Sequence, residues 1–356
     1  MQKKQITLAD LAKELGISTA TVSRALKDYP DISEETKRKV LELAKKLHYR
    51  PNSIAAGLRK RESRVIGVII PEIVNHFFSS VIKGIMEVAY EAGYRVMLCQ
   101  SDESYEKEVK DAETLLANRI DGLMVSIAHE TSDFQHFREF QDAGIPIVFF
   151  DKVPLVEFEN VSKIVVDDFQ GAYNSVQHLI SMGKRRIAHF RGPLIAYTSR
   201  NRLEGYKKAL SDSNIPIDEN LIFGCQDISL EEGYNYCRQA LALDEPCDAI
   251  FAVTDMVAMG AMIAARDAGV VIPDQLAIAG FSNWKISALM EPPLTSVDQP
   301  SLEMGRLASN LLLKEIQANK KEIEIKYETH VLKTHLMIRG SSDKNAILTT
   351  RQILLH

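Results

Sequence analysis

Four side chains near the N-terminus have the types and the spacing needed to contact the edges of DNA bases. Thr19, Ala20, Ser23 and Arg24 would share one face of a short helix. Short side chains let such a helix lie deep in the major groove, where threonine can contact base edges or a thymine methyl group and arginine can contact guanine. The alternative is an ordinary helical hairpin packed in a core, which has no need of these side chains on an outward face.

Two short helices joined by a tight turn are predicted to hold those side chains in place. Thr7 and Asp10 have the spacing of a capping box, Gly16 supplies the turn, and Ser18 is placed to cap the second helix. Apolar residues form one helical stripe in the first helix at Leu8, Leu11, Ala12 and Leu15. This pattern is typical of a helix-turn-helix.

A third helix is predicted to begin after Ser33, with acidic residues in its first turn and an apolar face toward the first two helices. It completes a three-helix headpiece over residues 1–49. Pro51 and Asn52 then break the helix, and we interpret residues 50–63 as a hinge segment.

The charge distribution supports a DNA-binding headpiece. Residues 1–64 hold 15 Lys and Arg against 8 Asp and Glu, a net charge of +7. The rest of the chain holds 28 against 40, a net charge of −12, which gives the overall −5. The net positive charge is confined to residues 1–64, whose basic side chains can neutralise phosphates, so DNA binding is expected to weaken steeply with salt.

Composition limits the other classes of function. The 356 residues are enough for a small module and one large or two medium domains. No apolar run resembles a signal peptide or approaches a membrane span of roughly 20 residues, so we expect a cytoplasmic protein without a membrane partner. The spacing of the four cysteines fits neither a zinc site nor a disulfide framework, and we expect them to be partly or fully buried. They are Cys99, Cys225, Cys237 and Cys247.

From residue 64 onward, apolar strand-like runs alternate with amphipathic helices, which predicts an α/β fold with doubly wound parallel sheets. The first set of runs is 65–70, 94–99, 121–126 and 145–150. The second set is 163–166, 186–190, 221–225, 249–253 and 275–281. A helix over 301–319 and two strand-like segments, 322–328 and 331–338, follow. Two such units predict a two-lobed body with a ligand cleft where strand ends converge.

The predicted boundaries follow from this pattern. The effector-binding and dimerisation domain covers residues 64–341, and a C-terminal tail covers 342–356. Lobe 1 is assigned to residues 64–162 with 300–321, and lobe 2 to residues 163–299 with 322–341.

Several motifs in this order resemble the LacI/GalR family of bacterial transcriptional regulators, from about Thr7 to Ser341. They are ATVSRAL (20–26), YRPNSIAAGL (49–58), RLEGY (202–206), VTDMVAMGA (253–261), AGFSNW (279–284) and EPPLTSVDQP (291–300). The resemblance implies a lambda-repressor-like headpiece and a body similar to periplasmic sugar-binding proteins. It also implies a homodimer on a palindromic operator of double-stranded DNA.

The resemblance places DNA-binding residues in the headpiece and the hinge: Thr7, Ser18, Thr19, Ala20, Thr21, Ser23, Arg24, Asn52, Ala55 and Leu58. It implies that residues 53–58 fold into a hinge helix on DNA and that Leu58 wedges into the central base step from the minor groove. Leu58 as an incidental linker residue is the alternative. Gly57 costs about 1 kcal/mol in a helix relative to Ala, so the hinge helix is expected to depend on DNA for its order.

The resemblance also implies that the effector is a small molecule bound in the cleft. The candidate effector-binding residues are Phe77, Phe78, Asp151, Arg202, Ile228, Thr254, Asp255, Ser282 and Asn283. Alternatives stay open for some of them: a surface ion pair for Arg202, a helix N-cap for Asp255, and core packing for Phe77 or Phe78.

Two departures from the family leave the ligand class open. Gly280-Phe281-Ser282-Asn283 replaces the frequent GFDD or GYDD, so a carboxylate is lost at Ser282, for which Asn283 could compensate. Ile228 stands where some relatives place an aromatic ring, although Trp284 is close in sequence to the cleft. A sugar or a sugar phosphate would suit neutral donors together with Arg202.

The leading hypothesis is therefore a transcriptional regulator, most simply a repressor, under allosteric control of a sugar or sugar derivative. A solute-binding protein of the transport class would leave the basic headpiece unexplained. The sequence does not support a nucleotide-dependent enzyme. It holds no GxGxxG after a strand, no GxxxxGKS and no Ser/His/Asp or metal-ligand cluster. We therefore expect no catalytic residue and no cofactor. The C-terminal segment lacks sustained heptads, which favours a dimer over a tetramer.

Overall fold

A computed structural model of the chain describes residues 6–47, 49, 62–156 and 158–346. The chain divides into two compact units, Met1–Ser63 and Arg64–His356, and each is described by itself.

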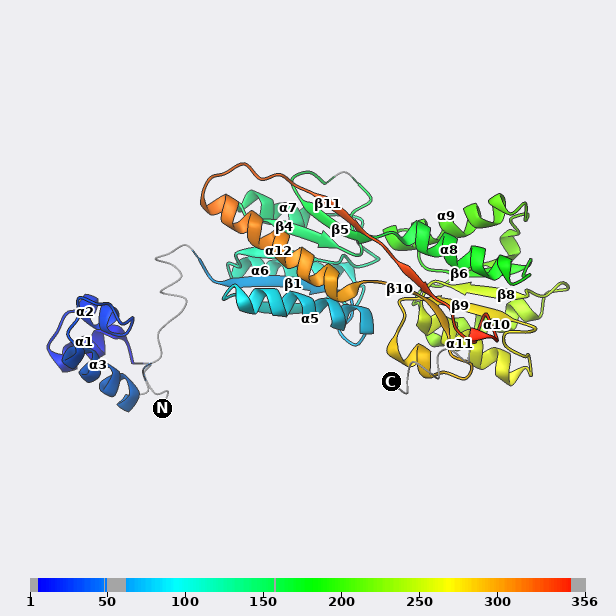
Figure 1. Cartoon of the computed structure of the whole chain (residues 1–356). Coiled ribbons are helices and arrows are strands. Elements are labelled where there is room, and N and C mark those ends of the chain that lie inside the picture. Colours follow the sequence, from blue (N-terminus) through cyan, green and yellow to red (C-terminus); the bar gives the residue numbers. More distant parts are fainter. Residues whose placement is uncertain (1–5, 48, 50–61, 157, 347–356) are drawn as a thin grey trace. The chain divides into compact units, whose positions relative to one another are not determined.

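Three helices lie in the described part of the first unit, as the periodicity predicts: α1 (Leu8–Leu15), α2 (Thr19–Ala25) and α3 (Glu34–Lys46) (Figure 1). Thr7 and Asp10 make the capping box of α1, and Gly16 ends that helix with a left-handed φ of 67°. Ser18 and Ser33 accept backbone hydrogen bonds at the starts of α2 and α3. Apolar side chains from all three helices meet in one small core, which includes Leu11, Val22, Ala25, Val40 and Ala44.

The second unit holds two lobes, each built on a six-stranded sheet. The first sheet has the order β11-β5-β4-β3-β1-β2 with all neighbours parallel. The second has the order β12-β10-β9-β8-β6-β7 and is parallel except for β12, which runs antiparallel to β10. The predicted fold class, doubly wound parallel sheets in a two-lobed body, is confirmed.

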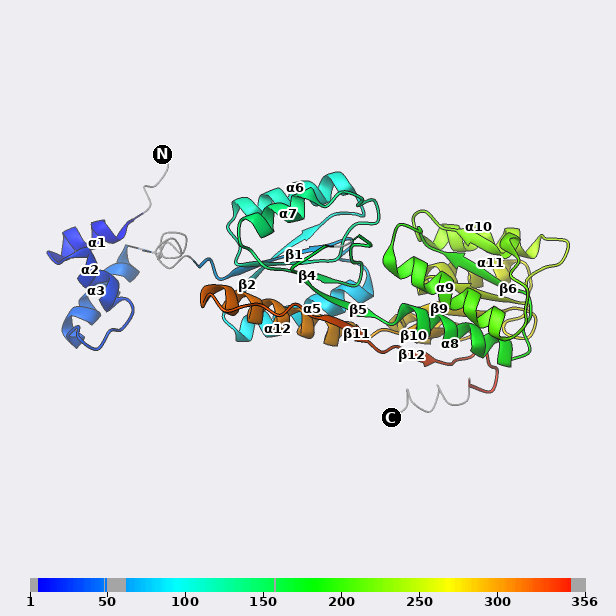
Figure 2. The ribbon, with the colours of Figure 1, turned by 90° about the horizontal axis from the view of Figure 1, so that it is seen from above.

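Each lobe has helices on both faces of its sheet. The strands of lobe 1 are β1 (Val65–Ile70), β2 (Arg95–Gln100), β3 (Gly122–Val125), β4 (Ile147–Phe150), β5 (Ser162–Val166) and β11 (Thr329–Leu332). Its helices are α5 (His76–Glu91), α6 (Tyr105–Ala117), α7 (Gln135–Asp142) and α12 (Ser301–Lys320). Helices α6 and α7 cover one face of the sheet, and α5 and α12 cover the other (Figure 2).

Lobe 2 repeats this plan. Its strands are β6 (Ile187–Arg191), β7 (Ile222–Gly224), β8 (Ala249–Ala252), β9 (Ala277–Phe281), β10 (Thr295–Asp298) and β12 (His335–Met337). Its helices are α8 (Asp168–Ser181), α9 (Tyr197–Asp212), α10 (Leu230–Leu241) and α11 (Asp255–Asp267), with short 3-10 turns at Glu219–Leu221 and Lys285–Leu289. Helices α10 and α11 pack on one face, and α8 and α9 pack on the other.

The strand pairing differs from the predicted boundary between the lobes. Strand β5 pairs with β4, and β11 pairs with β5, so both strands belong to the first sheet rather than to lobe 2. Residues 322–328 form no strand. The physical reason is that an apolar run such as 163–166 predicts burial in a sheet but carries no information about which sheet it joins.

Between β1 and β12 the described chain crosses between the lobes three times, after β5, after β10 and after β11. Two of these crossings are joined, because the amide of Asp167 donates to the carbonyl oxygen of Leu332 at 2.9 Å. Any change in the angle between the lobes therefore has to bend all three segments together.

The packed body also extends beyond the predicted end at residue 341. Ser342 is 3% exposed, and its hydroxyl lies 2.6 Å from that of Thr295 and 2.7 Å from Nε2 of His178. Lys344 forms an ion pair with Asp274. The predicted tail thus begins within a segment that is bonded to lobe 2.

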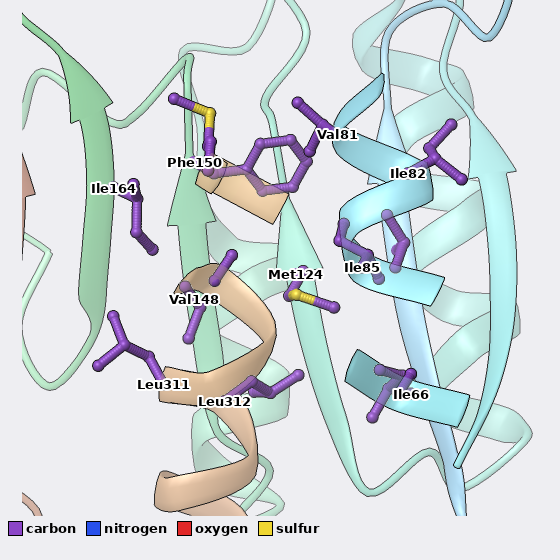
Figure 3. Close-up of a cluster of buried hydrophobic side chains, with 14 of the residues drawn as sticks. Ile66, Val81, Ile82, Ile85, Met124, Val148, Phe150, Ile164, Leu311 and Leu312 are labelled. Carbon is purple, nitrogen blue, oxygen red and sulfur yellow. The ribbon is translucent and has the colours of Figure 1, made fainter. Parts of the chain in front are cut away.

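Buried apolar side chains fill the core between the first sheet and helices α5 and α12 (Figure 3). These two helices cross closely. A Cβ atom on Gly84 would lie 2.3 Å from the carbonyl oxygen of Leu302, and one on Gly305 would lie 2.1 Å from that of Val81. The two backbones can approach this closely only because both positions lack a side chain.

We expect Gly305→Ala to lower the free energy of unfolding by about 1–3 kcal/mol, because the added methyl group would force α12 away from α5. Urea denaturation of the full chain measures this loss. Asn310→Ala, on the exposed side of the same helix, is the control and should change the stability little. Equal stabilities for the two variants would contradict the close crossing.

Candidate functional site

A cavity of about 340 Å³ lies between the two lobes, at the carboxyl ends of their strands. Lobe 1 contributes lining residues from the segments after β1, β2, β3 and β4, and lobe 2 contributes them from the segments after β6, β7, β8 and β9. This is the place at which doubly wound sheets bind ligands, and the sequence pattern predicts it. Seven of the nine predicted effector residues line the cavity: Phe77, Phe78, Asp151, Arg202, Ile228, Thr254 and Ser282.

Arg202 is the buried cation of the lobe 2 wall. Its Nε and Nη2 atoms both lie 2.8 Å from Oδ1 of Asp168, and its Nη1 donates to the carbonyl oxygen of Val253 at 2.6 Å. The guanidinium carbon stands 3.7 Å above the ring centroid of Phe281. With 5% of its surface exposed, Arg202 is not the surface ion pair that the sequence left open.

Two buried carboxyl groups lie near this guanidinium. Burial raises the pKa of Asp151 to about 7, although Lys152 and Arg202 act in the opposite direction. Burial likewise raises the pKa of Asp168 to about 6, and its Oδ2 has no hydrogen-bond partner among the described residues. Asp151 also holds a left-handed φ of 57° directly after β4. Of these two, Asp151 lines the cavity, so its carboxyl group offers acceptor atoms that a hydroxyl-bearing ligand could satisfy.

A second charged cluster forms the lobe 1 wall. Glu103 pairs with Lys152 and accepts a hydrogen bond from the amide of His129 at 2.8 Å, while Nδ1 of His129 lies 3.2 Å from the same carboxylate. Burial alone would raise the pKa of Glu103, but Lys152 and His129 lower it to about 2. Glu103 thus ties together three loops, those that follow β2, β3 and β4.

The sequence analysis did not identify Glu103, His129 and Lys152 as site residues. A signal was present, because Glu103 and Lys152 follow predicted strands just as Asp151 does. Other residues that the prediction missed line the same cavity: Glu72, Asn75, Thr198, Ser199, Val253, Met256, Gln299, Trp284 and the segment Gln226, Asp227, Ser229 and Leu230.

Apolar side chains complete the cavity. Phe77 and Phe78 are buried in the core of lobe 1, and their rings meet edge to face with centroids 5.2 Å apart. Both rings also line the cavity, so core packing and a ligand contact are compatible for these residues. Ile228 and Trp284 lie on the lobe 2 side.

Asp255 and Asn283 do not line the cavity. Thr254, rather than Asp255, is the N-cap of α11. The carboxylate of Asp255 accepts from the amide of Trp284 at 2.7 Å and from two serine hydroxyls, within lobe 2. The Asn283 side chain donates to Asp298 and accepts from Arg339. Both side chains are occupied in supporting the loop after β9, so Asn283 does not replace the carboxylate lost at Ser282.

The predicted DNA-binding residues of the headpiece divide into two groups. Thr7, Ser18 and Thr21 are engaged in helix caps, since Thr7 bonds to Asp10 and the hydroxyls of Ser18 and Thr21 lie 2.8 Å apart. Thr19, Ala20 and Arg24 are exposed on α2, and Ser23 is half-buried. The predicted outward face is therefore present. Asn52, Ala55 and Leu58 lie outside the described residues.

Comparisons with known proteins decide the family. Residues 7–52 match the family model described as bacterial regulatory proteins, lacI family. Residues 63–335 match the model described as periplasmic binding proteins and sugar binding domain of LacI family. This chain belongs to the LacI family of bacterial transcription regulators.

Relatives along nearly the whole chain agree with this assignment to the LacI family. Catabolite control protein A of Priestia megaterium is 33% identical over 311 residues, which cover 87% of this chain and 92% of that protein. The ribose operon repressor of Halalkalibacterium halodurans is 34% identical over 346 residues, which cover 96% of this chain and 99% of that protein.

Solved structures of other transcription regulators share the fold. The Lac repressor dimer bound to operator and the anti-inducer ONPF is 27% identical with a TM-score of 0.81, and the match covers 95% of this chain and 99% of that one. The complex of the transcriptional regulator CelR with cellobiose is 27% identical with a TM-score of 0.72, and covers 95% of this chain and all of that one.

In the described residues, no helix has the length and apolar character needed to cross a membrane. No group of three or more His, Cys, Asp or Glu side chains in the same part of the chain could hold a metal ion.

The buried carboxyl group of Asp151 predicts a pH effect on the ligand-free protein. Its raised pKa means that the folded chain still holds this proton at pH values where the unfolded chain, with a pKa of about 3.9, has released it. The stability contributed by the protonated group is present below pH 4 and is lost as the pH rises through about 7.

Because Asp151→Asn cannot titrate, its free energy of unfolding should rise relative to that of the wild type between pH 4 and pH 7. Urea denaturation of both proteins at each pH measures the difference. Parallel pH profiles would show that Asp151 is not a buried acid in the folded state.

Proposed function

We propose that this protein is a transcriptional repressor that binds a palindromic operator as a homodimer and that a small molecule in the cleft controls this binding. The observation that carries the proposal is the presence, in one chain, of an exposed polar face on α2 and a polar cavity at the carboxyl ends of two sheets. The names of the relatives, among them a ribose operon repressor, support the same function.

In this proposal Thr19, Ala20, Ser23 and Arg24 contact base edges in the major groove, because they lie on the outward side of α2. The caps made by Thr7, Ser18 and Thr21 place helix N-termini and hydroxyl groups where a phosphate could approach. The roles of Asn52, Ala55 and Leu58 in a DNA-bound hinge belong to the same proposal. Two headpieces of a dimer then read two half-sites.

The charges around the cavity favour a neutral effector. Both cations in its wall are paired, Lys152 with Glu103 and Arg202 with Asp168. The carboxylates of Glu72 and Asp227 line the same space, together with the carboxyl group of Asp151, whose pKa is raised. A phosphate group placed there would meet the negative charges of Glu72 and Asp227 without an unpaired cation in the wall to compensate, which disfavours binding.

A neutral sugar fits these walls better than a sugar phosphate. Its hydroxyl groups can donate to Asp151 and can pair with the neutral side chains of Thr198, Ser199 and Gln299. Its apolar faces can pack against the aromatic side chains that line the cavity, which are those of Phe77, Phe78 and Trp284.

The base-contact role of Arg24 is tested by Arg24→Ala. We expect this variant to lose selectivity for the cognate operator, by about 5- to 150-fold, while salt-dependent binding to random DNA remains. Fluorescence anisotropy with a selected operator and with random duplexes, each over a range of salt concentrations, measures both properties. If the wild type has no salt-dependent affinity for DNA, the proposed function is wrong.

The charge of the cavity is tested by Glu103→Gln. In the wild type we expect thermal stabilisation by neutral sugars from a panel that includes ribose, glucose and cellobiose, but not by ribose 5-phosphate, glucose 6-phosphate or inorganic phosphate. The E103Q substitution frees Lys152, so the affinity for inorganic phosphate should rise about tenfold.

Glu72→Gln is the matched control, since it removes the same charge from the cavity wall and Glu72 makes no ion pair with Lys152 in the described part of the chain. Stabilisation of the wild type by sugar phosphates, or an equal gain in the two variants, would contradict the role given to Glu103.

A further inference from the structure

The guanidinium of Arg24 is held from two sides by the loop that follows α2. Asp31 forms an ion pair with Nη2 of Arg24, and the guanidinium carbon lies over the ring of Tyr29, 5.5 Å from its centroid. Neither partner belongs to α2. About half of the side-chain surface of Arg24 and of Asp31 is exposed, so the pair lies at the surface and faces water.

The loop itself is anchored to the headpiece at both ends. The amide of Tyr29 donates to the carbonyl oxygen of Arg24 at 3.1 Å, and Asp28 takes a left-handed φ of 56°. Lys37 of α3, whose side chain is 10% exposed, pairs with both Asp28 and Glu34. Further along, Ile32 packs against the headpiece core. The contacts of Arg24 are thus made by a fixed loop.

This arrangement contributes little to folding stability. An exposed ion pair is worth between zero and about 1 kcal/mol, and an exposed cation–π contact is worth about as much. An acidic side chain beside a DNA-binding arginine also repels phosphates. Residues 1–64 have a net charge of +7, so a negatively charged partner for an arginine in this segment needs another explanation, and orientation of the arginine provides one.

Arginine recognises guanine with two donors at once, and this requires a fixed orientation of the planar group. The guanidinium has five N–H donors. The contact with Asp31 uses one of the two N–H groups of Nη2. The other N–H of Nη2 can still act together with the N–H of Nε or of Nη1 beside it, so one two-donor edge stays available for guanine. Tyr29 limits rotation of the plane. A side chain held in this way loses less conformational entropy when it binds a base than a freely rotating one.

We propose that Asp31 and Tyr29 are positioning residues for Arg24, which fix its guanidinium for a two-donor contact with guanine and so set how strongly one base pair of each half-site is discriminated. This inference rests on the proposed function, in which Arg24 contacts a base. It adds that the loop after α2 determines specificity without touching that base.

The test begins with the full-length wild-type chain and an operator selected from random duplexes. Operators with single base-pair changes are then titrated with Arg24→Ala, and the pair at which this variant loses discrimination is the pair that Arg24 contacts. If no such pair exists, Arg24 does not contact a base, and the positioning role is wrong with it.

Asp31→Asn is then titrated against the same operators. We expect discrimination at the Arg24 pair to fall about tenfold and discrimination at the other pairs to stay within a factor of two. Tyr29→Leu should cause a smaller loss at the same pair. In the Arg24→Ala background, Asp31→Asn should have no further effect on discrimination, because the group that it positions is absent.

Glu42→Gln is the matched control, because it removes one exposed carboxylate of α3 that pairs with Arg38 and not with Arg24. It should strengthen binding to all sequences to a similar small extent. If Asp31→Asn behaves as Glu42→Gln does, with discrimination at the Arg24 pair intact, then Asp31 acts only through its charge and the positioning role is wrong. Unchanged thermal unfolding of the variants shows that the headpiece remains folded.

Discussion

The buried ion pair of Arg202 and Asp168 is the interaction on which the effector cavity depends. A guanidinium that is 5% exposed would cost several kcal/mol to bury alone, so it requires the carboxylate, the carbonyl oxygen of Val253 and the ring of Phe281 around it. These partners come from the start of α8 and from the carboxyl ends of β8 and β9. Asp168 itself follows the first of the three crossings between the lobes. The same buried ion pair therefore supports both the lobe 2 wall of the cavity and the junction between the lobes.

The same pairing determines what the cavity can accept. Because Arg202 and Lys152 both have carboxylate partners, the remaining polar groups are mainly acceptors and neutral hydroxyls or amides. Asp151 brings a carboxyl group with a raised pKa to the cavity from lobe 1, and Thr198 and Ser199 bring hydroxyl groups from lobe 2. A neutral ligand that bonds to both sides is bound best when the two lobes approach it, and regulation requires such a difference in affinity between lobe arrangements.

Much of this could be predicted from the sequence. The helix-turn-helix followed from caps and periodicity at Thr7, Gly16 and Ser18, and the doubly wound sheets followed from apolar runs that alternate with helices. Local patterns could not place β5 and β11, because sheet partners are set by long-range contacts. Asp255 failed as a cavity residue for a similar reason, since its hydrogen bonds to the loop after β9 depend on tertiary structure. Glu103 and Lys152 follow predicted strands just as Asp151 does, so their place at the cavity could have been predicted. Their ion pair could not, because it forms only where three loops meet in the folded chain.

The central claim is that the cavity and the DNA-binding face are coupled, and thermodynamic reciprocity tests it most directly. Isothermal titration calorimetry with a stabilising sugar, on the full chain alone and on its operator complex, gives the ratio of the two ligand affinities. Anisotropy with labelled operator, without ligand and at saturation, gives the ratio of the two operator affinities. The account predicts that the two ratios are equal and differ from one by about fivefold or more, with operator weakening the ligand if the ligand releases DNA. Identical ligand affinities with and without operator would contradict it.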